Sequence, residues 1–441
     1  MPSHKYKPAP APAPKPTVTV SAAPSYTQSF STVSANSQGK SPGRPAHAIA
    51  HFGFGGKLVC HFHSRYTPSK EIHVFKVKDI IPSEHRNVQP NKVFPLVEAR
   101  DNEVMEFIAQ KVDPSNPPSM LWELIRFASQ SHGRLRSDAG VSDPSSPEAA
   151  ICNFLLSHPM SCITPPSVQA VDPIDPAMVA ETMASVQASL LKGQREKALA
   201  AALDAKQYPL ALLIASICGR QKYQEVVRQY MTSISHVGSV LHTVGMVFSG
   251  QGDVVAKDPN EMLTTDWMPN LAAVITNRTN GWDGVVRELG DRLLSQGKTV
   301  EGHFCHMVAG GNIEPPSPQA RLVLLGVDHR NAAALQLKNS EGISSFQLTE
   351  AFEWAKRRGN KSACIPSLQA FKLSYARVAA DEGEVELARS YVRSIKRLIE
   401  RGAGTKYSPA FLNALDVFED RVNMNLAKGE KTERKTSLFG R

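Results

Sequence analysis

The stretch Gly53-Phe54-Gly55-Gly56-Lys57 contains the residue types of a phosphate-binding loop. A phosphate cradle places such a loop at the start of a helix, because the amides and the dipole of the helix N-terminus hold the anion. Here the glycines precede Leu58 and Val59, so the loop opens a strand instead. A hairpin turn with positive φ angles, which glycine adopts freely, explains these residues, and no nucleotide site is predicted.

Six histidines near this stretch could supply metal ligands. They are His47, His51, His61, His63, His73 and His85. His61 and His63 are two residues apart, so on a strand they share one face, whereas Cys60 points to the other. Two ligands do not make a metal site, and no third partner stands at a characteristic spacing. The pattern favours polar histidines on a strand face, and no metal is predicted.

Cys305 and His306 have the residue types of a nucleophile and its base. Adjacent residues of a helix point about 100° apart, so this pair cannot form a charge relay, and Cys305 is predicted to pack in the core. The six cysteines include no Cys-x-x-Cys pair, which indicates neither a disulfide framework nor a zinc site and favours a reducing compartment. Without a convergent set of acid, base and metal ligands, the chain is predicted to be no enzyme and to need no cofactor.

The glycine stretch belongs to a predicted β-meander of about three strands between Ala46 and Ile81. Turn signals at Gly53–Gly56 and Tyr66–Ser69 separate runs rich in β-branched and aromatic residues. Both faces of the run from Glu71 are predicted to be apolar. One face takes Ile72, Val74 and Ile80, and the other takes Phe75, Val77 and Ile81.

Such strands need cover on both faces, because a sheet of two or three strands is marginally stable in water. A blade inside a β-propeller has that environment. A β-cap folded onto the first helices of the same chain is the alternative, and the residue pattern leaves both open. The residues predicted to bind a propeller are Phe52, Gly53, Phe54, Gly55, Gly56, Lys57, Leu58, Val59, Ile72, Val74, Phe75 and Val77.

The remainder of the chain is predicted to be mainly α, as an irregular α-solenoid of short paired helices. Apolar residues recur at helical spacing from near Asn102. The predicted helices are 104–112, 120–128, 148–157, 177–191, 195–205, 208–218, 223–234, 239–248, 266–277, 282–295, 300–309, 318–325, 347–357, 368–381, 385–400 and 409–427. The most apolar run, Leu210–Cys218, is too short to span a bilayer and is predicted to be a buried helix.

The composition is that of an ordinary folded protein, with 441 residues, of which 41% are hydrophobic and 21% charged. The formal net charge of +9 is concentrated at the two ends. Residues 1–45 carry five basic and no acidic residues, and residues 428–441 carry five basic and two acidic residues. The nearly neutral body excludes a nucleic-acid groove, and the sparse basic ends predict weak peripheral membrane contact at most. No signal peptide is expected, because the first residues are rich in Pro and Lys.

The stretch His51–Val59, followed by a long helical array, is similar to the central region of the Sec-sixteen family, the COPII coat assembly scaffold of endoplasmic-reticulum exit sites. Further matching motifs lie downstream in the same order. They are Ala211–Ser216, Leu289–Ser295, Gly302–Gly310, Leu324–His329 and Gln369–Ala376. Each motif alone is short, and their joint order over roughly residues 46–427 carries the resemblance.

The resemblance implies a helical ancestral coatomer element whose leading strands insert as the missing blade of a WD-repeat propeller, the thirteenth Sec protein of the COPII outer coat. It also implies binding of COPII inner-coat subunits by the helices, a homodimer through the central helices, and a site on the cytosolic face of the endoplasmic reticulum close to the Golgi. The expected divisions are a tail at 1–45, the blade at 46–81, the solenoid at 82–427 and a basic tail at 428–441. A related coat-cage or nuclear-pore subunit would share this architecture and is the alternative.

Overall fold

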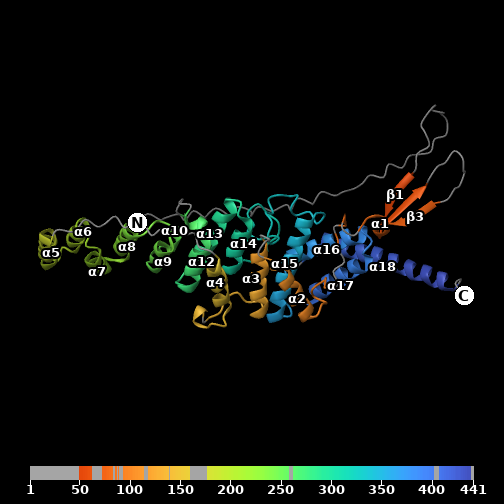
Figure 1. The fold of residues 1–441 in the computed structure, drawn as a ribbon, viewed down its shortest axis with the longest axis horizontal. Helices are drawn as coiled ribbons and strands as arrows, with labels where there is room; N and C mark the ends of the chain where they lie inside the picture. Colours follow the sequence, from red (N-terminus) through yellow and green to blue (C-terminus); the bar gives the residue numbers. More distant parts are fainter. Residues whose placement is uncertain are drawn as a thin grey trace, which may run out of the picture. The chain divides into compact units, whose positions relative to one another are not determined.

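The computed structural model describes residues 49–61, 72–82, 85–86, 88, 93–113, 118–138, 140–158, 176–257, 262–401 and 407–438. The tail at 1–45, His47, His63 and the Tyr66–Ser69 turn lie outside these residues. Within them the chain is mainly helical, with one small sheet before the first helices (Figure 1). None of the described helices is long and apolar enough to cross a membrane.

The sheet has three antiparallel strands in the order β1 (Ile49–Gly53), β2 (Lys57–His61) and β3 (Ile72–Lys76), which confirms the meander. The prediction that the last strand continues to Ile81 is wrong. The chain forms a single helical turn, α1 (Val77–Ile80), directly after β3. The Val77 amide still donates to the Gly56 carbonyl at 2.7 Å, which extends the β2–β3 pairing by one position. The helical turn ends the strand there, so the strand faces predicted for Ile80 and Ile81 do not exist.

Most of the remaining helices follow the predicted ones to within a few residues. They are α2 (Asp101–Lys111), α3 (Ser119–Gln130), α4 (Pro147–Ser157), α5 (Pro176–Leu191), α6 (Arg195–Asp204), α7 (Tyr208–Cys218), α8 (Arg220–Ile234), α9 (Val240–Phe248), α10 (Gly252–Lys257), α11 (Met262–Thr265), α12 (Trp267–Thr276), α13 (Trp282–Ser295), α14 (Thr299–Val308), α15 (Ser340–Gly359), α16 (Pro366–Asp381), α17 (Val385–Arg401) and α18 (Pro409–Leu438). Neither α10 nor α11 was predicted. The last helix, α18, continues past the predicted boundary at residue 427.

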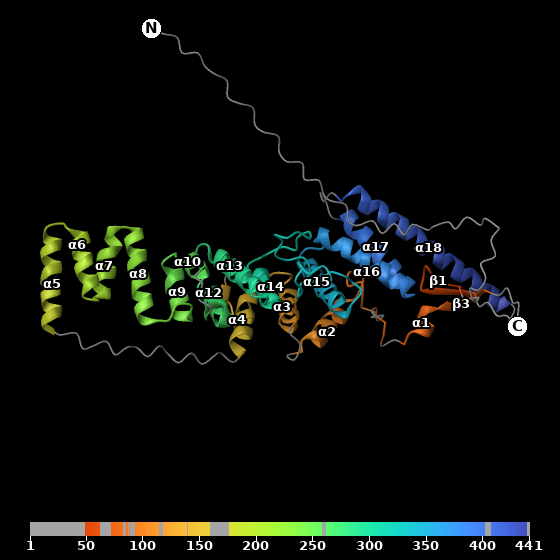
Figure 2. The same ribbon diagram turned by 90° about the horizontal axis from the view of Figure 1, so that it is seen from above.

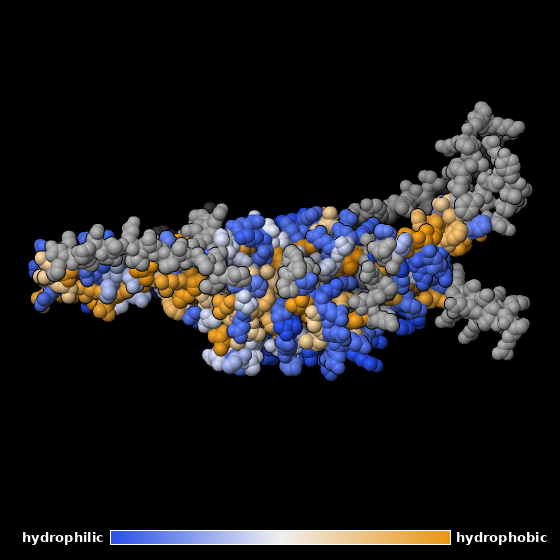
Figure 3. Space-filling view, in the orientation of Figure 1, coloured by the Kyte–Doolittle hydropathy of each residue, from blue (hydrophilic) through white to orange (hydrophobic). Residues whose placement is uncertain are grey.

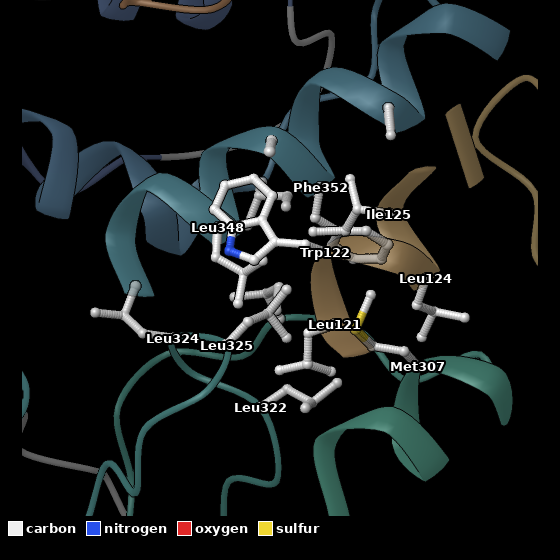
Figure 4. Close-up of a cluster of buried hydrophobic side chains, with 14 of the residues drawn as sticks. Leu121, Trp122, Leu124, Ile125, Met307, Leu322, Leu324, Leu325, Leu348 and Phe352 are labelled. Atoms are coloured by element: carbon white, nitrogen blue, oxygen red, sulfur yellow. The ribbon is translucent and has the colours of Figure 1, made fainter. Parts of the chain in front are cut away.

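The order of the helices along the chain is not their order in space. The early helix α3 packs against α14 and α15, and α4 packs against α12. Figure 4 shows Leu121 and Trp122 of α3 beside Met307 of α14 and beside Leu348 and Phe352 of α15. One large hydrophobic core therefore joins segments about two hundred residues apart, at contacts that no local periodicity encodes.

The helices α5 to α8 form a second, smaller core and lie side by side in sequence order (Figure 2). Small side chains, including Ala198, Ala202, Ala211 and Ala215, are fully buried there and let neighbouring helices approach closely. The prediction that α7 is a buried helix is wrong for one of its faces. Leu213 and Ile217 of α7 are 70% and 58% exposed.

An irregular segment between α14 and α15 replaces the helix predicted at 318–325. Its apolar run is nevertheless buried, because Leu322, Leu324 and Leu325 belong to the large core. Figure 4 shows Leu322 near Leu121 of α3. The Leu325 amide donates to Thr349 Oγ1 of α15 at 2.9 Å, which fixes the segment without helical hydrogen bonds. A short buried apolar run cannot be assigned to helix or extended chain by its spacing alone, which explains the error.

Charged residues are buried where α15, α16 and α17 meet. Glu350, Glu353 and Lys372 are all fully buried, and the Lys372 ammonium pairs with Glu353 and lies 3.7 Å from Glu350. Backbone amides and neighbouring side chains complete the network, since Ile365 N donates to Glu353 at 2.7 Å and Tyr391 Oη donates to Glu350 at 2.8 Å. Burial raises the pKa of Glu350, although the nearby Lys372 opposes that shift.

Candidate functional site

The strand register divides the sheet residues between two faces, because partners across an antiparallel ladder point the same way. Phe52 pairs with Leu58, which pairs with Phe75, and these three residues share one face. The opposite face takes the next register position, where His51 pairs with Val59 and Val59 with Val74. Ile72 lies on this second face, two residues from Val74. Apolar residues therefore occupy both faces, as predicted.

These apolar side chains are largely open to solvent. Phe52 is 80% exposed and Phe75 40% exposed on the first face, and Ile72 is 66% and Val74 59% exposed on the second. Figure 3 shows the resulting hydrophobic surface on the sheet. Exposed apolar patches of this kind mark sites of interaction, and a three-stranded sheet also offers free strand edges to a partner.

The hairpin turn between β1 and β2 attaches the sheet to the helices. Phe54 packs edge-on against Phe418 of α18, with ring centroids 6.0 Å apart. Asn425 Nδ2 of the same helix donates to the Phe54 carbonyl at 3.3 Å. Phe54 is thus turned toward its own chain, whereas Phe52 two residues earlier points to solvent.

Gly55 and Gly56 both have positive φ angles, of 81° and 61°, as a tight turn requires. Gly56 has a second reason to be glycine, because a Cβ there would stand 2.5 Å from the Gly383 amide nitrogen in the turn between α16 and α17. The atoms nearest to a Cβ on Gly55 belong to the Asn425 side chain, the first of them at 2.8 Å. The backbone of the hairpin therefore touches the backbone of the helical body.

The residues predicted to bind a propeller fall into two groups, on the open faces of the sheet and at its attachment to the helices. Phe52, Ile72, Val74 and Phe75 lie on the open faces, and Leu58 and Val59 lie between them on the central strand. Lys57 pairs with Gly53 and Lys76 at the end of the ladder near the turn. The other predicted residues lie at the attachment to the helices. Phe54, Gly55 and Gly56 form the turn that contacts α18 and the α16–α17 turn, and the Val77 amide donates to the Gly56 carbonyl.

Sequence reasoning missed the other side of this attachment. Phe418, Asn425 and Gly383 lie more than three hundred residues from the hairpin in sequence, and no motif links them to it. The alternative of a β-cap on the first helices of the chain is also corrected, because the described contacts of the turn are made to α18 and to the α16–α17 turn.

The other candidate chemistry does not assemble. Cys305 is fully buried, and burial raises the pKa of its thiol far above the ordinary value, so it is a core residue as predicted. His306 Nε2 lies 3.2 Å from Asp291 Oδ1, and Arg321 binds the same carboxylate through two hydrogen bonds of 2.7 Å. Burial acts to raise the pKa of Asp291, but the adjacent His306 ring and the two hydrogen bonds from Arg321 outweigh that effect and lower the pKa to about 2. Among the described residues no group of three or more His, Cys, Asp or Glu side chains could hold a metal ion.

An α-solenoid that carries a sheet with two open apolar faces defines a class of scaffold proteins that assemble through their partners. Residues 186–438, more than half of the chain, match the family described as the Sec16 Sec23-binding domain. The chain belongs to the Sec16 family.

Curated relatives agree with this assignment. The chain is 28% identical over 407 residues to the protein transport protein SEC16A homolog of Arabidopsis thaliana, a match that covers 81% of this chain and 30% of that protein. It is 30% identical over 230 residues to human protein transport protein Sec16A, covering 51% of this chain and 10% of that protein. The chain thus spans about a third or less of the length of these relatives.

One solved structure shares the fold. A chain of the Sec13/Sec16 complex of S. cerevisiae superposes with a TM-score of 0.55 at 18% identity, and the match covers 87% of this chain and all of that one. The arrangement of a three-stranded sheet followed by stacked helices is therefore an arrangement already seen in a solved structure.

Proposed function

We propose that this chain is a scaffold for COPII coat assembly and that β1, β2 and β3 bind a WD-repeat propeller by adding a blade to it. One observation carries the proposal: both faces of the sheet are apolar and open, while its turn is fixed to the helices. Relatives named COPII coat assembly proteins support it, and so does the fold shared with a chain of the Sec13/Sec16 complex, which suggests Sec13 as the kind of propeller.

The physical argument rests on buried area. A β-cap would cover one face of the sheet, whereas a blade is packed between two neighbours and covered on both. The exposed side chains are those of Phe52, Ile72, Val74 and Phe75. Burial of each one contributes up to about 1.5 to 3 kcal/mol to the free energy of binding, and less where the side chain is already partly covered. That sum is comparable to the roughly 4 to 15 kcal/mol that association costs in lost translational and rotational freedom. The apolar faces therefore offset this cost, and the other contacts of the inserted blade provide the net affinity.

The inner coat is the second proposed partner. Residues 186–438 match a family described by its binding of Sec23, and this range holds α6 to α18 and part of α5. We therefore assign Sec23 binding to the helical body, apart from the sheet. The match to this family also favours a COPII scaffold over a nuclear-pore or other cage subunit.

A second copy of the chain is the third proposed partner, through the central helices. Leu213 and Ile217 lie one turn apart on α7, and Leu241 and Phe248 lie two turns apart on α9, where they are 57% and 61% exposed. Figure 3 shows hydrophobic surface along this part of the array. Light scattering of the purified chain and of its Leu213→Asp, Phe248→Asp variant tests this, with a dimer expected for the first and a monomer for the second.

The proposed location is the cytosolic face of the endoplasmic reticulum at its exit sites. Partners, rather than lipid, are proposed to bring the chain there, because the basic residues of the two ends are few and any segment that docks on lipid loses conformational entropy. Liposome flotation at physiological salt should therefore give weak binding without partners, and strong binding by the chain alone would contradict this.

Deletion of residues 46–81 tests the proposal for the sheet. The deletion should abolish co-purification with the purified Sec13 propeller and leave the helical circular-dichroism signal per helical residue unchanged, because the helices retain the large core. Propeller binding that survives the deletion would refute the proposal.

A further inference from the structure

A groove lies beside the hairpin turn, between α16 and α18. Its volume is about 460 Å³, and Phe54 of the turn forms part of its wall. Arg377 and Asp381 line it from α16, and Val417, Phe418 and Arg421 line it from α18. The same phenyl ring of Phe54 thus attaches the sheet to α18 and closes one side of the groove.

Two arginines set the charge of the groove. The Arg377 guanidinium stands 5.9 Å from the centre of the Phe418 ring, and burial, then the neighbouring Arg421, lowers the pKa of Arg377. Asp381 is the single carboxylate among the residues that line the groove. The two positive charges of Arg377 and Arg421 are therefore balanced by the one negative charge of Asp381. A second carboxylate placed between the arginines would relieve their repulsion.

Exposed apolar residues extend the groove along α18 toward the sheet. Val417, Arg421 and Met424 are spaced by four and three residues and so lie on one face of the helix. Val417 is 46% and Met424 65% exposed. The next residue, Asn425, donates to the Phe54 carbonyl, so this face is continuous with the attachment of the sheet.

We propose that this groove is a second contact for the propeller that binds the sheet, and that it receives a propeller loop carrying an Asp or Glu next to an apolar side chain. The inference rests on the proposed function. The carboxylate lies between Arg377 and Arg421, and the apolar neighbour covers Val417. A partner that packs against both faces of the sheet also passes close to Phe54, because Phe54 follows Phe52 by only two positions in the chain.

The two contacts have different roles. The sheet contributes apolar burial, and the groove contributes charge pairing that fixes the angle between propeller and solenoid, because charged pairs at an interface set orientation and association rate more than affinity. The groove contact is also expected to weaken with added salt, since exposed charges are screened beyond about 10 Å at 0.1 M.

The Arg377→Glu, Arg421→Glu double variant tests the groove by titration calorimetry of the full chain with the purified Sec13 propeller. We expect binding at least tenfold weaker than wild type and a shallower dependence on salt. The control is Arg393→Glu, at another exposed arginine, which lies on α17 outside the groove and should bind within twofold of wild type. Arg421→Gln, at the exposed surface of α18, replaces the double variant if the reversal prevents folding, with a severalfold loss expected.

The outcomes separate the groove from the sheet. One outcome is that deletion of residues 46–81 abolishes binding while the arginine variants keep the affinity and salt dependence of the wild type. That result would refute the proposed groove contact and leave the proposal for the sheet intact. Retention of binding after the deletion overturns the proposed function itself. An equal loss in Arg393→Glu and in the groove variants would also overturn the groove, because it would show a general effect of charge.

Discussion

The sheet and the core of α15 to α17 reverse the usual distribution of residues. In the sheet, apolar side chains such as Phe52 and Val74 are mostly exposed, whereas in the core the charged side chains of Glu350, Glu353 and Lys372 are fully buried. The core is complete in this respect, because its two buried carboxylates lie beside the Lys372 ammonium and accept hydrogen bonds from neighbouring groups. The sheet is incomplete, because the described part of the chain leaves both of its faces largely uncovered. The difference separates the part that holds the fold from the part that binds.

Loss of Lys372 should have the largest effect on stability. Lys372→Met leaves Glu353 buried without its cation, and breaking a buried ion pair on one side costs about 3 to 5 kcal/mol. Urea unfolding should show this loss. Lys396→Met is the matched control, since Lys396 pairs with Asp416 and Glu419 at the surface and its loss should cost at most about 1 kcal/mol. Equal costs would mean that the buried network is not what stabilises this core.

Gly56→Ala probes the boundary between the two regions. The alanine Cβ would stand 2.5 Å from the Gly383 amide nitrogen, and the residue would also be held at positive φ, at a local cost of about 1 to 3 kcal/mol. The hairpin must then move off the α16–α17 turn, so affinity for the propeller should fall. Gly193→Ala has a similar φ of 68° with no atom within 4 Å of the added Cβ, and it should cost only the backbone strain and leave binding unchanged. Indistinguishable variants would show that the close approach of Gly56 is unimportant.

Acid should destabilise the helical core through His303 by a smaller amount. Burial, and then the nearby His306 and His329 rings, lower the pKa of His303 to about 3. The unfolded chain takes up this proton near pH 6.5 and the folded chain does not, so stability is present above pH 6.5 and is lost as the pH falls toward 3. The loss between pH 7 and 5.5 should be about 1 kcal/mol.

The free energy of unfolding of His303→Gln, measured over the same pH range, isolates the contribution of the His303 imidazole. Glu350 acts in the opposite direction, because its raised pKa gives stability below the ordinary value of 4.5 that is lost as the pH rises. The wild type should therefore lose about 1 kcal/mol more than His303→Gln over this interval. Parallel pH profiles of the two proteins would contradict a neutral buried His303.

The sequence predicted elements well where the signal was local. The glycine turn, the three strands, and helices such as α7 and α13 follow from turn residues and apolar spacing, and the apolar character of both sheet faces follows from residue parity. Non-local contacts were not predictable. The packing of α3 between α14 and α15, the contact of Gly56 with Gly383, and the burial of Leu322 and Leu324 without a helix each depend on residues far apart in the chain. The exposed face of α7 was not predicted, because apolar residues lie on all sides of this helix and their spacing does not indicate which side is buried.

The most direct test of the central claim is to place a charge on one face of the sheet at a time. Phe52→Asp and Val74→Asp alter opposite faces at exposed positions, so each should fold with an unchanged melting temperature and bind the propeller at least a hundredfold more weakly. Leu191→Asp on α5, where the leucine is 82% exposed, is the control and should bind normally. Loss of binding in both sheet variants is the predicted result. Wild-type affinity in either one would mean that the partner covers at most one face, which would contradict insertion as a blade.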